Sequence, residues 1–356
     1  MELNDLFLAA ADSGASDILL VSGAPPMLRL DGDLMPTELD PLTPSVLERL
    51  IFGQLTEEQS RILREDGDLD YSISVPRLGR FRVNAHRQRD TYGMAIRYIP
   101  NRIPTLEELR LPRVVESLTR LQQGLVLVTG QTGSGKSTTL AAIIDRINRD
   151  QPVHIVTLED PIEFVFDHGR AIVEQREVGT DCKSFASALR HVVRQDPDII
   201  LVGELRDLET ISVALSAAET GHLVFGTLHT TSAAGTVDRL IDVFPASQQP
   251  QIRCQLSDSL RAVISQQLLL RAGGRGRVAA QEIMVVTRAV ERCIREQENH
   301  MIPGIIETGR KFGMQTIQQA IAELKSSGLI DPDHAGAQAE LLDVSSYSTG
   351  DLVGVR

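Results

Sequence analysis

Residues 130–137 read GQTGSGKS and fit the phosphate-binding pattern GxxxxGK[ST] at every position. The apolar run LVLVT directly before them is predicted to be a strand, and a helix-forming run begins near Lys136. Glycine lets the backbone turn its N–H groups toward phosphate oxygens, and the helix N-terminus adds positive potential at the same point. This stretch therefore predicts a strand, a loop and a helix that bind ATP or GTP.

The residues of this loop are expected to share the binding of the nucleotide. Lys136 is expected to reach the β and γ phosphates, and Ser137 is expected to ligate Mg²⁺. The other residues predicted to contact the nucleotide are Gly130, Gln131, Thr132, Gly133, Ser134, Gly135 and Thr138.

Apolar runs that are typical of buried strands continue on both sides of the loop. They read LVLVTG from residue 125, HIVTLED from 154, IILVGE from 199 and LVFGTLH from 223, and each precedes a helical or loop segment. This alternation predicts a parallel sheet wrapped by helices. After about Thr287 the apolar residues take three- and four-residue spacings, which predict helices, and the final dozen residues are expected to lack fixed structure.

Acidic residues follow two of these runs, at the sheet edge where α/β proteins hold ligands. Glu204 ends the stretch DPDIILVGE and is the candidate to position or activate water, the alternative being a cap for the next helix. Glu159 and Asp160 stand before Pro161, where they could hold Mg²⁺ through water, share the activation of water, or form a turn. The choice of base between Glu159 and Glu204 stays open.

Two histidines flank the fourth run, His222 before it and His229 after it. A histidine just past such a strand can sense the γ-phosphate or orient water by hydrogen bonding. A zinc pair is the competing function, but a seven-residue separation with no cysteine or third histidine nearby does not match common zinc spacing. His229 is therefore predicted to act at the nucleotide, with a core histidine as the alternative.

The composition excludes several classes of protein. Acidic residues exceed basic ones by 48 to 36, the net charge is -12 and aromatic residues make up 4%, so no nucleic acid partner is expected. The cysteines, Cys182, Cys254 and Cys293, are far apart, which argues against disulfides and zinc and favours buried free thiols. No apolar run is long enough to span a bilayer, and the start lacks the basic flank of a signal peptide, so a cytoplasmic location is expected.

With 356 residues, the chain is expected to form about two domains. The first hundred residues alternate short strand-like runs with turn signals, which predicts a small mixed α/β domain. Three prolines, Pro100, Pro104 and Pro112, then surround a helix-like segment that reads TLEELRL. The interdomain linker is expected here.

The last strands of the first domain carry several arginines. These strands are expected at residues 79–87 and 92–99, where apolar residues alternate with Arg80 and Arg82. By themselves, the arginines of this region indicate a solvated face of the sheet; they are Arg80, Arg82, Arg87, Arg89 and Arg97.

Four stretches together resemble the motifs of the secretion ATPase superfamily, and within it the PilT family. They are the phosphate loop, an aspartate box at 157–164 (TLEDPIEF), the strand that ends at Glu204, and a histidine box at 220–229. PilT-like stretches at 15–32, 80–88, 194–211 and 305–316 extend the resemblance over most of the chain. It implies an α/β fold with a PAS-like N-terminal domain at 1–99, a linker at 100–112, a RecA-like P-loop ATPase core at 113–287, a helical C-terminal region at 288–343 and a disordered tail at 344–356.

The resemblance also implies a function. It is that of a homohexameric motor that hydrolyses ATP, with Mg²⁺, to power type IV pilus retraction and twitching motility. The catalytic residues it implies are Glu204, Glu159 and His229, with Arg82 and Arg97 brought from the N-terminal domain onto the phosphates, and Asp160 near the metal. The partners it implies are an inner-membrane pilus platform protein, on which the motor docks from the cytoplasm, and other pilus motor ATPases.

Two features bear on the direction of the motor. Related assembly and export ATPases usually carry an additional N-terminal domain and a tetracysteine zinc motif, which this sequence lacks, and this favours retraction. PilT proteins typically show a helix that reads AIRNLIRE, whereas residues 289–296 read AVERCIRE, so that Glu291 replaces an arginine. Because this helix is linked in the family to retraction, a pilus assembly or type II secretion ATPase and an accessory PilU-like subunit stay as alternatives.

Overall fold

The computed structural model describes residues 2–30, 32–76, 78–100, 102–274 and 276–331. They form two compact α/β units, the first up to Ile103 with the short segment Glu163–Val165, and the second beginning at Pro104. The predicted fold class, an N-terminal α/β domain and a P-loop ATPase domain, is confirmed. The predicted domain bounds stay predictions, and the predicted tail at 344–356, with residues 332–343 before it, lies outside the described residues.

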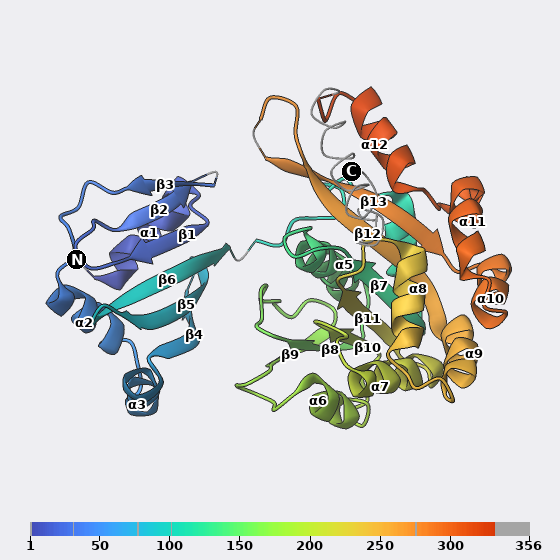
Figure 1. The fold of residues 1–356 in the computed structure, drawn as a ribbon, viewed down its shortest axis with the longest axis horizontal. Helices are drawn as coiled ribbons and strands as arrows, with labels where there is room; N and C mark the ends of the chain where they lie inside the picture. The colour runs from blue at the N-terminus through green and yellow to red at the C-terminus, as the bar shows by residue number, and fades with distance from the viewer. Residues whose placement is uncertain (1, 31, 77, 101, 275, 332–356) are drawn as a thin grey trace, which may run out of the picture. The chain divides into compact units, whose positions relative to one another are not determined.

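The first unit is built on a six-stranded antiparallel sheet in the order β3-β2-β1-β6-β5-β4 (Figure 1). The strands predicted at 79–87 and 92–99 are β5 and β6. The strands are β1 (Asp17–Leu20), β2 (Met27–Leu30), β3 (Asp33–Pro36), β4 (Asp68–Val75), β5 (Gly79–Gln88) and β6 (Thr91–Pro100). The helices of this unit are α1 (Leu3–Ser13), α2 (Pro44–Phe52) and α3 (Glu57–Asp66).

An aromatic stack lies in the core of the first unit. The ring of Phe7 on α1 lies 3.9 Å from that of Phe81 on β5, and the ring of Phe81 lies 5.0 Å from that of Tyr98 on β6. Phe7 and Phe81 are fully buried, which stabilises the unit by roughly 2–3 kcal/mol for each ring. Side chains alternate between the two faces of a sheet along a strand. Arg82 follows Phe81 and Arg97 precedes Tyr98, so both arginines lie on the opposite, exposed face.

The second unit is built on a seven-stranded sheet in the order β13-β12-β7-β11-β10-β8-β9, in which β13 is antiparallel and the other strands are parallel. Every residue of β7, β10 and β11 is buried, as expected for parallel strands covered on both faces. The strands are β7 (Gly124–Thr129), β8 (His154–Glu159), β9 (Ile172–Glu177), β10 (Ile199–Val202), β11 (Leu223–Leu228), β12 (Leu260–Leu270) and β13 (Arg277–Val285).

Helices cover both faces of this sheet. The helix after the phosphate loop, α5 (Lys136–Asp150), buries Leu140, Ile143, Ile144 and Ile147 on one face. On the opposite face one continuous core joins alternate residues of the strands to the later helices. The remaining helices are α4 (Arg113–Leu118), α6 (Phe185–Val192), α7 (Leu208–Glu219), α8 (Ala233–Asp242), α9 (Gln249–Ser259), α10 (Arg288–Arg295), α11 (Ile302–Thr308) and α12 (Ile317–Ser326).

Three strands of the second unit, β9, β12 and β13, were not predicted from the sequence. β12 and β13 form a long hairpin that extends past the neighbouring strands, with α12 beside it (Figure 1). Leu269 and Val278 of the hairpin pack there against Ala320 and Ile321 of α12. The hairpin places β12 directly beside β7, so it also lies next to the phosphate loop.

Two local predictions were wrong. The segment TLEELRL forms a single hydrogen-bonded turn rather than a helix, with the Leu109 N–H donating to the Thr105 carbonyl at 3.0 Å. The chain leaves this turn at Arg110, whose φ of 55° is incompatible with a continued helix. Of the three cysteines only Cys293 is buried, and Cys254 is exposed, although all are free thiols.

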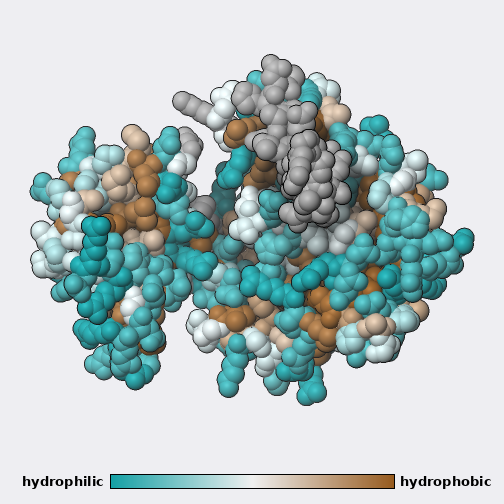
Figure 2. All heavy atoms as spheres, in the orientation of Figure 1, coloured by the Kyte–Doolittle hydropathy of each residue, from teal (hydrophilic) through white to brown (hydrophobic). Residues whose placement is uncertain are grey.

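The surface of the described residues carries mainly polar side chains in the view shown (Figure 2). The face drawn in Figure 2 is mostly hydrophilic, with hydrophobic residues in small groups. None of the helices in the described ranges is long and apolar enough to cross a membrane.

Candidate nucleotide-binding site

The phosphate loop joins β7 to α5, as the sequence predicts. Gly135 precedes the first residue of α5 with a left-handed φ of 86°, a conformation that glycine adopts without steric cost. Among the described residues no side chain caps this helix, so the N–H groups of its first turn are available to an anion. The loop therefore has the conformation that phosphate binding requires.

The polar side chains in the second half of the loop and the first turn of α5 have different surroundings. The Lys136 ammonium folds back over the loop and donates to the carbonyl oxygens of Gly130 at 2.7 Å and Gln131 at 3.0 Å. Ser137 and Thr138 are half-buried in the first turn of α5. The Ser134 hydroxyl is buried and has no hydrogen-bond partner within the described ranges. A buried hydroxyl without a partner is costly, so a phosphate oxygen would satisfy it.

The predicted acidic and histidine residues leave the sheet at the same edge as the loop. In the order β7, β11, β10, β8, the residues that follow the strands are Gly130, His229, Gly203 with Glu204, and Asp160 after Glu159. Neighbouring ends are bonded directly, since the Gly130 N–H donates to Leu228 and the Gly203 N–H to Leu158. The structure thus gathers the candidates from four strands along one edge, as parallel strands require.

Glu204 lies between two basic side chains. Its Oε1 is 3.1 Å from Nε2 of His229 and 2.5 Å from Nε of Arg206. Burial by itself would raise the pKa of Glu204, but the hydrogen bond from Arg206 and the charges of His229 and Arg206 outweigh it and lower that pKa. Glu204 is therefore ionised at neutral pH, and it fixes the position of His229 at the edge of the site.

Glu159 has a different environment. Its Oε1 accepts hydrogen bonds from the Thr157 hydroxyl at 2.7 Å and from the Gln175 amide at 3.0 Å. Thr157 is fully buried in β8, so it holds the carboxylate against the end of its own strand. Asp160, the next residue, is exposed. Glu159 and Glu204, the two carboxylates predicted to act on water, are thus both held in place. The geometry leaves open which of them is the base.

The two histidines lie at opposite ends of β11. His222 precedes the strand, and its Nδ1 is 3.0 Å from the Ala217 carbonyl oxygen, whereas His229 follows the strand beside Glu204. The strand separates them, which is incompatible with a shared zinc ion. Within the described ranges, no group of three or more histidine, cysteine or acidic residues is arranged to hold a metal ion.

Arg82 and Arg97 belong to the first unit. They stand directly opposite each other on β5 and β6, and both are exposed. Arg97 donates to Asp17 at 3.0 Å, while Arg80, nearby on β5, is half-buried and donates to the Ser72 hydroxyl at 2.7 Å. Their predicted action on the phosphates stays a prediction.

Several residues that shape the site were missed in the sequence. Arg206 pairs with Glu204, Gln175 bonds to Glu159, and Gln266 of β12 bonds to the phosphate loop. Arg206 stands two residues after Glu204, so its charge there was a usable signal. The two glutamines come from strands that no motif marks.

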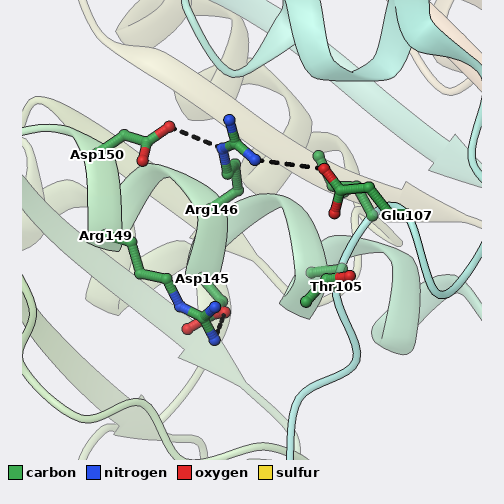
Figure 3. A pocket seen from close by; sticks show the side chains of 8 residues that line it. Thr105, Glu107, Asp145, Arg146, Arg149 and Asp150 are labelled. Carbon is green, nitrogen blue, oxygen red and sulfur yellow. Dashed lines mark hydrogen bonds and ion pairs between the residues drawn. The ribbon is translucent and has the colours of Figure 1, made fainter.

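A small pocket lies on α5 away from the loop, lined by Thr105, Glu107 and the charged residues of the helix (Figure 3). Arg146 pairs there with Asp150 at 2.7 Å and with Glu107 at 3.4 Å, and Arg149 pairs with Asp145 at 2.6 Å. Burial raises the pKa of Asp145 in spite of Arg149. Three acidic residues outnumber the two arginines of this pocket, so it does not compete with the loop as a phosphate site.

Known proteins share this architecture. A family model described as "Type II/IV secretion system protein" matches residues 105–272. The type IV pilus retraction ATPase PilT of Pseudomonas aeruginosa is 48% identical over 96% of this chain and 99% of its own length. The type IV pilus ATPase PilU of the same organism is 40% identical over 96% of this chain and 89% of its own. A crystal structure of the pilus retraction motor PilT with bound ADP has a TM-score of 0.88 at 46% identity, and the match covers 94% of this chain and 96% of that one.

A phosphate loop and carboxylates at the edge of a parallel sheet define a P-loop ATPase. With these relatives along nearly its whole length, the chain belongs to the PilT family of secretion ATPases.

Proposed function

We propose that this chain is an ATP-hydrolysing motor that retracts a type IV pilus. The observation that carries the proposal is the 48% identity to the pilus retraction ATPase PilT over 96% of the chain. Intact site residues support it: the loop that binds phosphate and the two carboxylates, Glu159 and Glu204, are all present at one sheet edge.

The binding of ATP follows from the loop. The Lys136 ammonium would exchange its two loop carbonyls for oxygens of the β and γ phosphates, which are stronger acceptors because they are charged. The loop residues 130–138 would surround the phosphates with N–H groups and hydroxyls. ADP bound to the PilT crystal structure supports the same ligand class for this chain.

Mg²⁺ fits the oxygen donors of the site. Mg²⁺ usually keeps several waters and binds to one or two protein oxygens and the phosphates, and this set provides the Ser137 hydroxyl and, through water, Asp160. When bound, the ion would neutralise charge that develops on the phosphates.

Hydrolysis requires a water molecule in line with the γ-phosphate. Glu204 and Glu159 are the two proposed bases, and His229, held by Glu204, would orient the water or contact the γ-phosphate. Arg82 and Arg97 are proposed to stabilise the charge of the transition state, which in comparable enzymes contributes about 10³ to 10⁵ in rate.

The motor is proposed to be a homohexamer docked from the cytoplasm on an inner-membrane platform protein of the pilus, with other pilus ATPases as partners. Rotation of domains driven by ATP would return pilin subunits to the membrane. Deletion of the gene tests this: hyperpiliated cells without twitching are expected. Fully retractile pili in the deletion strain, with purified protein that hydrolyses ATP, would exclude retraction, and cells without pili would indicate an assembly motor.

An accessory, PilU-like role is the second candidate, and Glu291 favours it. Glu291 lies in the first turn of α10, where a negative charge is stabilised by the helix dipole, so the fold accepts it in place of an arginine. The helix could therefore keep its shape and lose its contact with a partner. Normal retraction in a strain with Glu204→Gln would show that turnover by this chain is dispensable and would favour the accessory role.

A further inference from the structure

One buried side chain holds the phosphate loop from behind. Nε2 of Gln266 on β12 donates to the Ser134 carbonyl oxygen at 2.7 Å, and its Oε1 accepts from the Thr139 hydroxyl at 2.8 Å. Ser134 belongs to the loop and Thr139 to the first turns of α5, so one amide joins the two. Gln266 is 5% exposed and Thr139 is 2% exposed, and hydrogen bonds shielded from water in this way hold a defined geometry.

The glycines of the loop leave room for Gln266. A Cβ on Gly135 would lie 2.8 Å from Nε2 of Gln266. A Cβ on Gly130 would lie 2.3 Å from the backbone carbonyl oxygen of Gln266. Both distances are too short for a real side chain. The same two glycines that let the backbone approach a phosphate on one side therefore admit this glutamine on the other.

The orientation of the Gln266 amide is fixed by a second glutamine. Nε2 of Gln281, on the adjacent strand β13, also donates to Oε1 of Gln266 at 2.8 Å. Gln281 is 2% exposed, and its backbone carbonyl oxygen accepts a hydrogen bond from the Gln315 side-chain amide at 2.9 Å. A flipped Gln266 amide would set its Oε1 against the Ser134 carbonyl oxygen, and both atoms can only accept, so Nε2 must face Ser134.

We infer that Gln266 is a positioning residue for nucleotide binding, an inference that rests on the proposed ATP site. In a planar trans peptide the C=O and the next N–H point in opposite directions. By holding the Ser134 carbonyl toward β12, Gln266 turns the Gly135 N–H away from β12 and toward the phosphate side. It fixes the loop before the nucleotide arrives, which reduces the cost of ordering on binding.

The experiment compares Gln266→Met with the matched control Gln267→Met. Methionine has a similar length and removes all three hydrogen bonds, whereas Gln267 lies on the opposite face of β12. Binding of ADP is measured by calorimetry, and kcat and KM for ATP in parallel. For Gln266→Met we expect the Kd for ADP and the KM for ATP to rise about tenfold, with kcat changed less than about threefold. The control should bind within twofold of the wild type.

A purely structural role would lower the melting temperature without changing affinity. A folded Gln266→Met protein with a wild-type Kd for ADP would therefore overturn the inference. If that variant does not fold, Thr139→Val replaces it, with about a threefold weaker Kd expected because one of the bonds is lost, and an unchanged Kd would again overturn the inference. Failure of the proposed function is distinct: in that case the wild type itself would neither bind ADP nor hydrolyse ATP.

Discussion

Two regions of this chain carry residues predicted to handle ATP, and they are built in different ways. At the edge of the seven-stranded sheet, Glu204 and Glu159 are half-buried and bonded to side chains of their own unit. On the six-stranded sheet, Arg82 and Arg97 are exposed, and Arg97 is 68% exposed beside Asp17. Parallel strands gather and fix functional groups at one edge, whereas an antiparallel face presents them to solvent. We therefore expect the sheet edge, which also carries the phosphate loop, to determine binding and to contribute to turnover. We expect the arginine face to affect turnover alone.

The largest effect on nucleotide binding should come from the loop. Lys136→Ala removes a charged donor to two phosphates, so we expect ADP and ATP binding to weaken by about 100-fold or more. Calorimetry measures this, and the exposed Lys183→Ala variant of the same unit is the control. Unchanged affinity would mean that the loop does not bind the nucleotide, and the sheet edge would then not determine binding.

The arginine face should behave differently. Arg97→Ala and Arg82→Ala are each expected to lower kcat by about 10³ while the Kd for ATP stays within a few-fold, as for a group that acts in the transition state. Arg87→Ala is the control, since Arg87 is exposed on the same strand as Arg82 and pairs with Asp90. Equal losses in affinity and turnover would indicate structural arginines, and the two regions would no longer differ in kind.

The two carboxylates sharpen the comparison within the sheet edge. Substitution of the catalytic base by glutamine should lower kcat by a factor of about 10² to 10⁴, while ATP binding is retained. Steady-state kinetics of Glu204→Gln and Glu159→Gln, measured side by side, identify it. A similar small loss in both variants would mean that neither carboxylate takes the proton from water.

The smallest effect concerns stability and the half-buried carboxyl of Glu282. Burial raises the pKa of Glu282 on β13, although its bond from the Ala233 N–H opposes the shift. A raised pKa means that the folded state loses stability as pH rises from the unfolded value, about 4.3, through the folded value. Glu282→Gln keeps the acceptor without the charge, so we expect a higher melting temperature at pH 7 and little change near pH 4. The exposed Glu323→Gln variant should shift neither, and a lower melting temperature for Glu282→Gln at pH 7 would contradict the assignment.

The parts of the molecule that could be predicted are those encoded locally. The loop, its strand and its helix occupy consecutive residues. The strands β8, β10 and β11 are apolar runs, and Glu159, Glu204 and His229 lie at their ends or within two residues after them. Gln266 could not be predicted, because it bonds to Ser134 across 132 positions of sequence and only the order of strands brings β12 beside β7. The turn after Thr105 was missed for a different reason, since the positive φ of Arg110 follows from its surroundings rather than from its residue type.

The aromatic stack of the first unit has a spectroscopic consequence. The chain has no tryptophan and 4 tyrosines, of which Tyr71, Tyr92 and Tyr98 lie in the first unit and Tyr347 lies beyond the described ranges. Tyr98 stacks on Phe81, so its ring leaves an apolar contact when that unit melts. Intrinsic emission excited near the tyrosine absorption band therefore follows the first unit, while far-ultraviolet dichroism is dominated by the helices of the second. A single heating experiment read in both channels therefore tests, without any label, whether the two units melt separately.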